Sequence, residues 1–149
     1  MARRKRSEQL AAALKLAALR EQQAARKLGV QQQGLRQLEA QAEQLDSYRK
    51  EYRQQFLKAG SQGLDAQALR NYQGFFQNLA QADTLQAQRI EQARQQRSTL
   101  LAAWTRMHWR RKVMADLVQR RRTEEDREQE KRAERLQNDE LRRPVDPDP

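Results

Sequence analysis

The sequence has no cysteine, a single histidine and only three prolines in 149 residues. Without cysteine the chain has no disulfide, no thiolate metal site and no cysteine nucleophile, and this usage suits a reducing compartment. One histidine without any cysteine does not supply the usual ligand set of a zinc site. Because a glycine-rich phosphate loop is missing as well, the sequence predicts a protein that is not an enzyme and holds no cofactor or metal.

Long apolar runs are also missing. No stretch approaches the roughly 20 apolar residues that a membrane-spanning helix needs. Basic residues 3–6 imitate the start of a secretory signal, but Lys15 and Arg20 interrupt the apolar segment that follows them. We therefore expect a soluble chain that associates with a membrane only through a partner.

What the chain does contain is typical of long solvated helices, because charged residues make up 34% of it and hydrophobic residues 37%. The first proline is Pro144, so no proline interrupts a helix before that position. The apolar residues follow a narrow line and cannot enclose a compact core. The sequence therefore predicts one elongated domain over residues 1–149.

Apolar residues recur in alternating steps of four and three on each side of the glycine-containing segment 60–63. Eleven of the fourteen positions are apolar on the first side and ten of fourteen on the second, which is the spacing of a coiled coil. We call these positions the seam. The seam consists of Leu10, Leu14, Ala17, Glu21, Ala24, Leu28, Gln31, Leu35, Leu38, Ala42, Leu45, Arg49, Tyr52 and Phe56, and then of Tyr72, Phe76, Leu79, Asp83, Gln86, Ile90, Ala93, Arg97, Leu100, Trp104, Met107, Arg111, Met114 and Val118.

Two seams joined by a glycine turn predict an all-α fold, a long two-helix antiparallel coiled-coil hairpin with an overhanging C-terminal helix. We expect a helix over about residues 7–59, a turn at about 60–64, a second helix over about 65–142 and a disordered tail at 143–149. Ser7 and Asp65 are the expected N-caps of the two helices. The part of the second helix after about Leu117 is expected to overhang.

The net charge of +10 is spread unevenly. Residues 1–58 carry 13 basic and 6 acidic side chains, residues 59–119 carry 8 and 4, and residues 120–149 carry 9 and 10. The two arms of the predicted hairpin are therefore basic. A basic excess favours acidic partners, which include nucleic acid, anionic lipid and acidic protein surfaces.

A cluster of basic residues around a tryptophan resembles a nucleic-acid patch. A solvated helix face with basic side chains packed on the indole is the other interpretation. A basic coiled-coil nucleic-acid-binding protein is accordingly the alternative function, while the preferred interpretation expects no nucleic acid. The cluster consists of Arg106, Trp109, Arg110, Arg111 and Lys112.

Two features that suggest acid–base chemistry have simpler interpretations. His108 is expected to be a surface residue of a helix. The acidic residues 124–126 lie in the expected overhang, where carboxylates keep ordinary pKa values.

One shoulder of the seam carries a group of mainly apolar and aromatic residues, some of which are themselves seam positions. Four residues of the first predicted helix fall within an arc of about 60°, and four residues of the second repeat their spacing. In an antiparallel pair both sets lie on one face, where they either widen the core or form a binding surface. The set, which we call the mid-chain patch, is Gln41, Leu45, Tyr48, Tyr52, Phe75, Leu79, Ala82 and Gln86.

These same residues resemble the bacterial flagellar export protein family FliJ. The resemblance lies in the run from Gln41 to Tyr52, the turn at residues 60–63, and the motif at residues 71–75 followed by Leu79 and Ala82. It covers nearly the whole chain in architecture, and its specific residues fall within about 26–82. Stalk proteins of virulence type III secretion have a similar shape and are a second possibility within the same class. After this class and the nucleic-acid-binding alternative, a generic chaperone-like adaptor is the third function class.

The resemblance implies a cytoplasmic stalk component of the flagellar type III export apparatus, similar in form to the central stalk of rotary ATPases. It implies that the open end of the hairpin binds the export ATPase hexamer and regulates it. The mid-chain patch would contact the export gate membrane protein, and flagellar export chaperones would be further partners. The protein would be peripheral at the inner membrane, without insertion, and would serve protein transport, flagellum biogenesis and chemotaxis.

Overall fold

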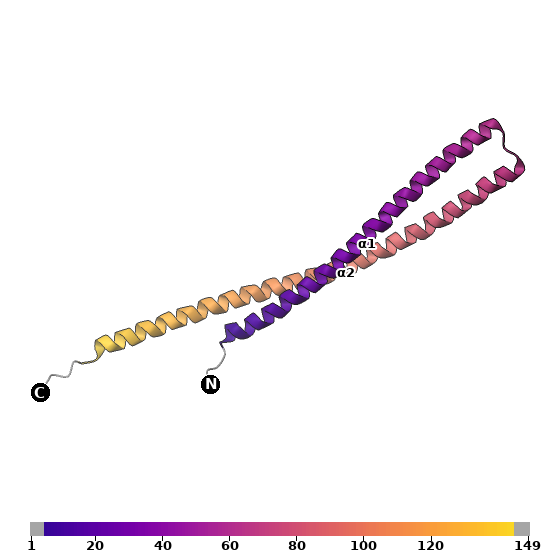
Figure 1. The fold of residues 1–149 in the computed structure, drawn as a ribbon. Helices are drawn as coiled ribbons and strands as arrows, with labels where there is room; N and C mark the ends of the chain where they lie inside the picture. The colour runs from indigo at the N-terminus through magenta and orange to yellow at the C-terminus, as the bar shows by residue number, and fades with distance from the viewer. Residues whose placement is uncertain (1–4, 145–149) are drawn as a thin grey trace. The chain divides into compact units, whose positions relative to one another are not determined.

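The computed structural model describes residues 5–144 and contains two long helices, α1 over Arg6–Gln62 and α2 over Ala66–Arg142 (Figure 1). They have 57 and 77 residues, and the described part of the chain contains no strand. The predicted all-α class with two long helices is therefore confirmed. The predicted disordered tail falls mostly on residues 145–149, which lie outside the described residues.

The contacts divide the chain into two units. The turn unit is Ala24–Trp104, and it contains the connection between the helices. The terminal unit combines the described residues 5–23 of the first part of the chain with residues 105–144 of the last part. Each unit therefore contains a segment of α1 and a segment of α2.

The start of α1 differs from the prediction. The backbone N–H groups of Glu8 and Gln9 donate to the carbonyl of Lys5 at 3.0 and 3.3 Å, so Lys5 occupies the position before the helix. Ser7 lies inside the first turn, and its hydroxyl donates to Glu125 at 2.6 Å instead of capping the helix. The expectation that Ser7 is the N-cap is therefore wrong, because its side chain has a partner on α2.

Glycine ends α1 slightly later than expected. The helix passes the predicted end near Ala59 and continues through Gly60 to Gln62. Gly63 follows with a φ of 92°, a left-handed conformation that is common just after a helix and that favours glycine. The turn is closed by a hydrogen bond of 3.3 Å from the Gly63 N–H to the Gly60 carbonyl.

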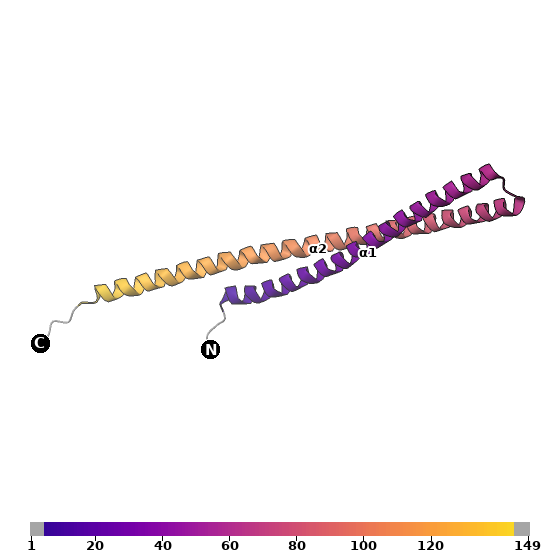
Figure 2. The same ribbon diagram turned by 45° about the horizontal axis from the view of Figure 1, so that its top comes forward.

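The start of α2 agrees with the prediction. The side-chain oxygen Oδ1 of Asp65 accepts a hydrogen bond from the Ala68 N–H at 2.7 Å, which is the geometry of an N-cap. The helix begins at the next residue, Ala66. Figure 2 shows the short connection between the two helices from a second direction.

In the turn unit, earlier residues of α1 contact later residues of α2. Tyr52 contacts Tyr72, whereas Leu38 accepts a hydrogen bond from Gln86. This is the contact order of an antiparallel pair. The buried apolar side chains of the turn unit all occupy seam positions: Leu28, Leu35, Leu79 and Ala93.

In the terminal unit, contacts between the two segments continue further along α2 than expected. Val118, another seam position, is only 3% exposed, and Glu125 is bonded to Ser7. The expectation that the overhang starts after about Leu117 is therefore wrong, because the first turn of α1 reaches Glu125. All described residues from Asp126 to Pro144 are exposed.

Candidate functional site

All eight residues of the mid-chain patch lie in the turn unit, but they differ in exposure. Tyr48 is 65% exposed and Gln41 is also exposed, whereas Leu79 is buried at 8%. The others are half-buried: Leu45, Tyr52, Phe75, Ala82 and Gln86. A partner that reached this face would therefore meet one almost uncovered aromatic side chain, that of Tyr48.

Tyr52 is the centre of an aromatic cluster that joins the two helices. Its ring centroid lies 3.7 Å from that of Phe75, 5.4 Å from Tyr72 and 5.9 Å from Phe76. Phe56 extends the cluster, with centroids 5.2 Å from Tyr72 and 5.6 Å from Phe76. Stacked and edge-on ring pairs of this kind stabilise an interface beyond the area that they bury. Tyr52 and Phe75 therefore hold the helices together in addition to lining the patch.

The polar residues of the mid-chain patch also connect the helices. The side-chain amide of Gln86 donates to the Leu38 carbonyl at 2.8 Å and to the side-chain oxygen of Gln41 at 3.3 Å. The structure thus brings together Gln41 with Gln86 and Tyr52 with Phe75. Four residues of the patch are fixed by contacts across the helix pair.

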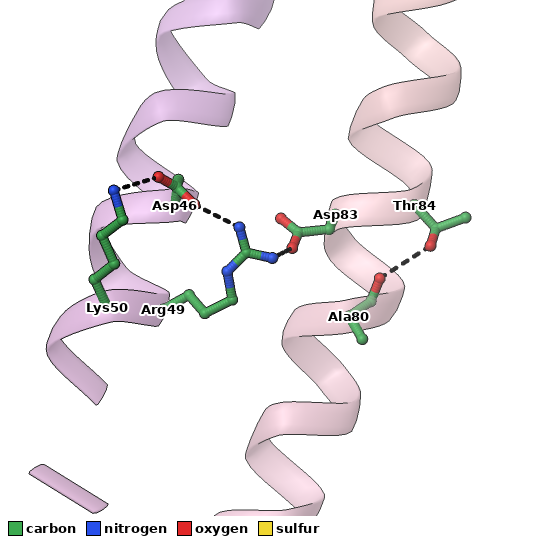
Figure 3. A network of polar contacts seen from close by, with 6 residues as sticks. All are labelled: Asp46, Arg49, Lys50, Ala80, Asp83 and Thr84. Carbon is green, nitrogen blue, oxygen red and sulfur yellow. Dashed lines mark hydrogen bonds and ion pairs between the residues drawn. The ribbon is translucent and has the colours of Figure 1, made fainter. Parts of the chain in front are cut away.

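An ion-pair network joins the two helices (Figure 3), at positions 49 and 83 that directly follow patch residues in the sequence. Arg49 of α1 bonds to Asp83 of α2 and to Asp46 of its own helix, and Lys50 pairs with Asp46 at 3.1 Å. Hydrogen bonds from Arg49 and then Lys50 lower the pKa of Asp46. The hydrogen bond to Asp46, followed by the charge of Asp83, raises the pKa of Arg49. Both shifts favour the ionised forms of Asp46 and Arg49, so these two side chains are suited to an ion pair and not to proton transfer.

Sequence reasoning left this network out of the candidate site, although a signal was present. Arg49 and Asp83 are two of the few polar seam positions, and their charges are opposite. When each of two facing seams has a charged residue at a position that is usually apolar, the two residues are candidates for an ion pair.

The single histidine lies in a second polar cluster, in the terminal unit. The nitrogen Nδ1 of His108 lies 3.0 Å from Oε1 of Glu21, and Arg111 bonds to the other oxygen of the same carboxylate. The hydrogen bond to His108, followed by that to Arg111 and by the charges of both, lowers the pKa of Glu21. The expectation that His108 is a plain surface residue is wrong, because His108 is half-buried and has a partner across the helix pair.

The residues of the basic cluster around Trp109 differ in their contacts. Arg111 is used in the pair with Glu21, whereas Arg106, Arg110 and Lys112 are exposed. The ammonium group of Lys112 lies 5.3 Å from the centre of the Trp109 ring, in cation–π contact. Even so, Trp109 remains 59% exposed.

The acidic residues 124–126 also differ from their expectation. Glu125 accepts hydrogen bonds from the Ser7 hydroxyl and, at 3.2 Å, from the Ser7 backbone N–H. The bond to the hydroxyl, followed by that to the backbone, lowers the pKa of Glu125. The expectation of an ordinary carboxyl pKa is therefore wrong for Glu125, because this residue lies opposite α1 and not in a solvated overhang.

The described residues contain neither a metal site nor a membrane-spanning helix. Within residues 5–144, no group of three or more His, Asp or Glu side chains is placed to hold a metal ion. No helix in the same range is long and apolar enough to cross a membrane.

A comparison with protein families identifies the group to which the sequence belongs. The model of the flagellar FliJ protein family matches residues 6–143. The chain belongs to the FliJ family. The resemblance inferred from the residues of the mid-chain patch is thereby confirmed, and the chain is a component of the flagellar export apparatus that serves flagellum biogenesis and protein export. No curated protein and no solved structure matched the chain.

Proposed function

We propose that the chain is a non-enzymatic stalk and adaptor of the bacterial flagellar type III export apparatus. The observation that carries the proposal is the FliJ family match over residues 6–143. In this proposal α1 and α2 form one antiparallel coiled-coil hairpin, and the part of α2 after Glu125 overhangs. The contact order in the turn unit and the exposure of residues 126–144 support this arrangement.

The proposed partners are the export ATPase hexamer, the cytoplasmic domain of the export gate membrane protein and flagellar export chaperones. The ends of the helices would contact the ATPase, and the mid-chain patch would contact the gate. The protein would act in the cytoplasm and be peripheral at the inner membrane through the export apparatus. The excess of basic side chains in residues 1–119, 21 against 10 acidic, supports association with acidic protein surfaces.

Tyr48 is the proposed anchor of the gate contact. Its side chain is 65% exposed, while its patch neighbours Tyr52 and Phe75 stack on each other and hold the helices. Exposed aromatic residues beside a rigid surface are common anchors of protein interfaces. A substitution of Tyr48 should therefore affect binding without affecting folding, whereas a substitution of Tyr52 or Phe75 would affect both.

The test is the binding of the Tyr48→Ala variant to the purified cytoplasmic domain of the gate, measured by calorimetry. An anchor that contributes about 2 kcal/mol weakens binding about 30-fold when it is removed. Helicity should stay unchanged in circular dichroism. Leu57→Ala is the matched control, because Leu57 is 63% exposed on the same helix but lies outside the patch. Wild-type affinity of Tyr48→Ala would rule out the patch as the gate contact.

The ATPase contact is tested by deletion of residues 126–149. This deletion keeps buried Val118 and the Ser7–Glu125 contact, whereas a deletion after Leu117 would remove both. We expect weaker stimulation of the export ATPase and unchanged gate binding. The purified chain alone should hydrolyse ATP no faster than background, because it has no phosphate-binding loop. Full stimulation by the shortened chain would move the contact away from the overhang.

The alternative function, nucleic-acid binding, is supported by the net charge of +10 and the exposed Trp109 with its basic neighbours. Binding to duplex DNA of random sequence that weakens steeply with salt would favour it. Such binding should be absent at physiological salt if the adaptor proposal holds.

A further inference from the structure

The terminal unit contains a groove of about 500 Å³ whose lining residues belong neither to the mid-chain patch nor to residues 126–149, the segment tested as the ATPase contact. Leu16 and Arg20 of α1 line it on one side, and Trp109, Arg110 and Val113 of α2 line it on the other. The less exposed lining residues are half-buried alanines and a methionine at positions 13, 17 and 114. The groove is thus apolar along its length, with an arginine from each helix beside it.

The apolar side chains of the groove are more exposed than the packing of two helices requires. Leu16 is 48% exposed, Val113 56% and Trp109 59%, and none of them occupies a seam position. On the outward positions of a solvated helix pair, polar residues are expected. A group of exposed apolar residues around a tryptophan instead marks a surface that contacts another molecule.

The charge around the groove is mainly positive. Residues 10–21 and 105–120 contain seven basic side chains and two acidic side chains, Glu21 and Asp116. Within the described part of the chain, neither Arg20 nor Arg110 forms an ion pair, in contrast to Arg111, which is paired with Glu21. The groove therefore offers apolar surface and unmatched arginines together.

We propose that this groove binds an amphipathic helix of a partner protein, one whose apolar stripe is flanked by acidic residues. A helix that lies between α1 and α2 would cover Leu16, Trp109 and Val113 with its apolar stripe, as in helix-in-groove recognition. Its carboxylates would pair with Arg20 and Arg110, whose guanidinium groups suit bidentate contact with carboxylates. A nucleic-acid backbone would match the arginines but leave the apolar strip against phosphates. The groove lies outside the mid-chain patch, so the inference does not depend on the proposed gate contact.

The probe is a synthetic peptide of about three heptads, with leucines in one stripe and glutamates on both flanks. Its binding to the full-length chain is followed by the fluorescence anisotropy of a dye on the peptide. We expect saturable binding that Leu16→Ser and Arg110→Glu each weaken about tenfold or more. In a Trp104→Phe variant Trp109 is the single tryptophan, and its emission should shift to shorter wavelength as the peptide covers it.

Matched controls on the turn unit separate the groove from general attraction. Leu85→Ser replaces another exposed leucine, 55% exposed, and Arg89→Glu replaces another exposed arginine of α2. Both should bind the peptide as the wild-type chain does, and circular dichroism should show equal helicity for all four variants. A peptide with lysines in place of the glutamates should not bind.

Three results would overturn the proposal. The first is the absence of saturable binding of the acidic peptide, and the second is equal binding of a scrambled peptide with the same composition. The third is binding that groove and control variants weaken equally. Vesicles of anionic phospholipid and duplex DNA are the comparison probes. If Leu16→Ser weakens binding to one of these probes but not to the peptide, the groove is a lipid or nucleic-acid surface and the proposal is wrong.

Discussion

The turn unit and the terminal unit follow the same seam pattern, but different contacts hold them. The turn unit contains the aromatic cluster around Tyr52 and, of the five buried apolar side chains among the described residues, all except Val118. Among the described residues of the terminal unit one apolar side chain, Val118, is buried, and polar contacts of Glu21 with His108 and Arg111 join its two segments. A heptad pattern therefore indicates where two helices meet, but not whether apolar or ionic contacts hold them.

The difference has an energetic consequence. Burial of apolar area contributes about 25 cal/mol per Å², whereas partly exposed ion pairs contribute about 0–1 kcal/mol each. The turn unit should therefore be the more stable of the two, and the terminal unit should open first.

The strongest test of this comparison removes the centre of the aromatic cluster. Tyr52→Ala deletes ring contacts with Phe75, Tyr72 and Phe76 and should lower the free energy of unfolding by about 2 kcal/mol, because the site is half-buried. Urea unfolding followed by circular dichroism measures the loss, and hydrogen exchange should place it in the turn unit. Tyr48→Ala is the control and should change stability by no more than about 0.5 kcal/mol. Equal losses in both variants would contradict this account of the cluster.

A smaller loss is expected from the polar cluster of the terminal unit. Glu21→Gln removes the carboxylate that contacts His108 and Arg111, and we expect a loss of about 1 kcal/mol after allowing for solvent screening. Glu39→Gln is the matched control, since Glu39 pairs with Arg94 across the turn unit at 3.5 Å and both side chains are more exposed. The control should have almost no effect on the urea midpoint. A larger effect of Glu39→Gln would show that exposure does not decide the strength of these pairs.

The exposed pair of Arg49 and Asp83 should matter less than the pair of Glu21 and Arg111. Either single exchange, Arg49→Asp or Asp83→Arg, should destabilise the turn unit through like charges. The double exchange should recover only part of the loss, because an aspartate at position 49 would repel Asp46. A double-mutant cycle in urea measures the coupling. Zero coupling would mean that the two side chains do not interact in solution.

The smallest expected effect is a difference in pH dependence. The pKa of Glu21 is lowered by the hydrogen bond to His108 and by Arg111, so its folded value lies below its unfolded value. Its contribution is therefore complete above the ordinary carboxyl pKa and is lost as the pH falls through the lower, folded pKa. Between about pH 5 and pH 3 the wild-type chain should lose more stability than Glu21→Gln. Parallel stability curves for the two proteins over this range would contradict the assignment.

The sequence predicts the core of the molecule well, for a physical reason. Within residues 5–144 all five buried apolar residues, among them Leu35 and Val118, are seam positions, because the heptad period fixes which face of a helix is covered. The Asp65 cap was also predictable, since its hydrogen bond is local. The same rule failed at Ser7, where a partner 118 residues away competes for the hydroxyl.

The sequence does not predict which residues of α1 and α2 face each other, nor how deeply each side chain is buried. A shift by one heptad leaves the seam pattern unchanged, so the partner of Glu125 depends on where the turn begins and ends, which the period does not fix. The mid-chain patch shows the same limit: Tyr48 and Leu79 belong to one predicted shoulder, yet one is exposed and the other buried. Angular position predicts a face, whereas depth depends on the size and packing of the neighbours.

The order of the charged residues along the two seams favours antiparallel pairing over parallel pairing. Along α1 the acidic Glu21 comes before the basic Arg49, and along α2 the acidic Asp83 comes before the basic Arg111. Within one chain each acid meets a base. In a parallel pair of two identical chains in register, every seam residue would meet its own copy, and Glu21 would face Glu21 while Arg49 faced Arg49. The four side chains that join the helices of one molecule thus disfavour the side-by-side alignment of two.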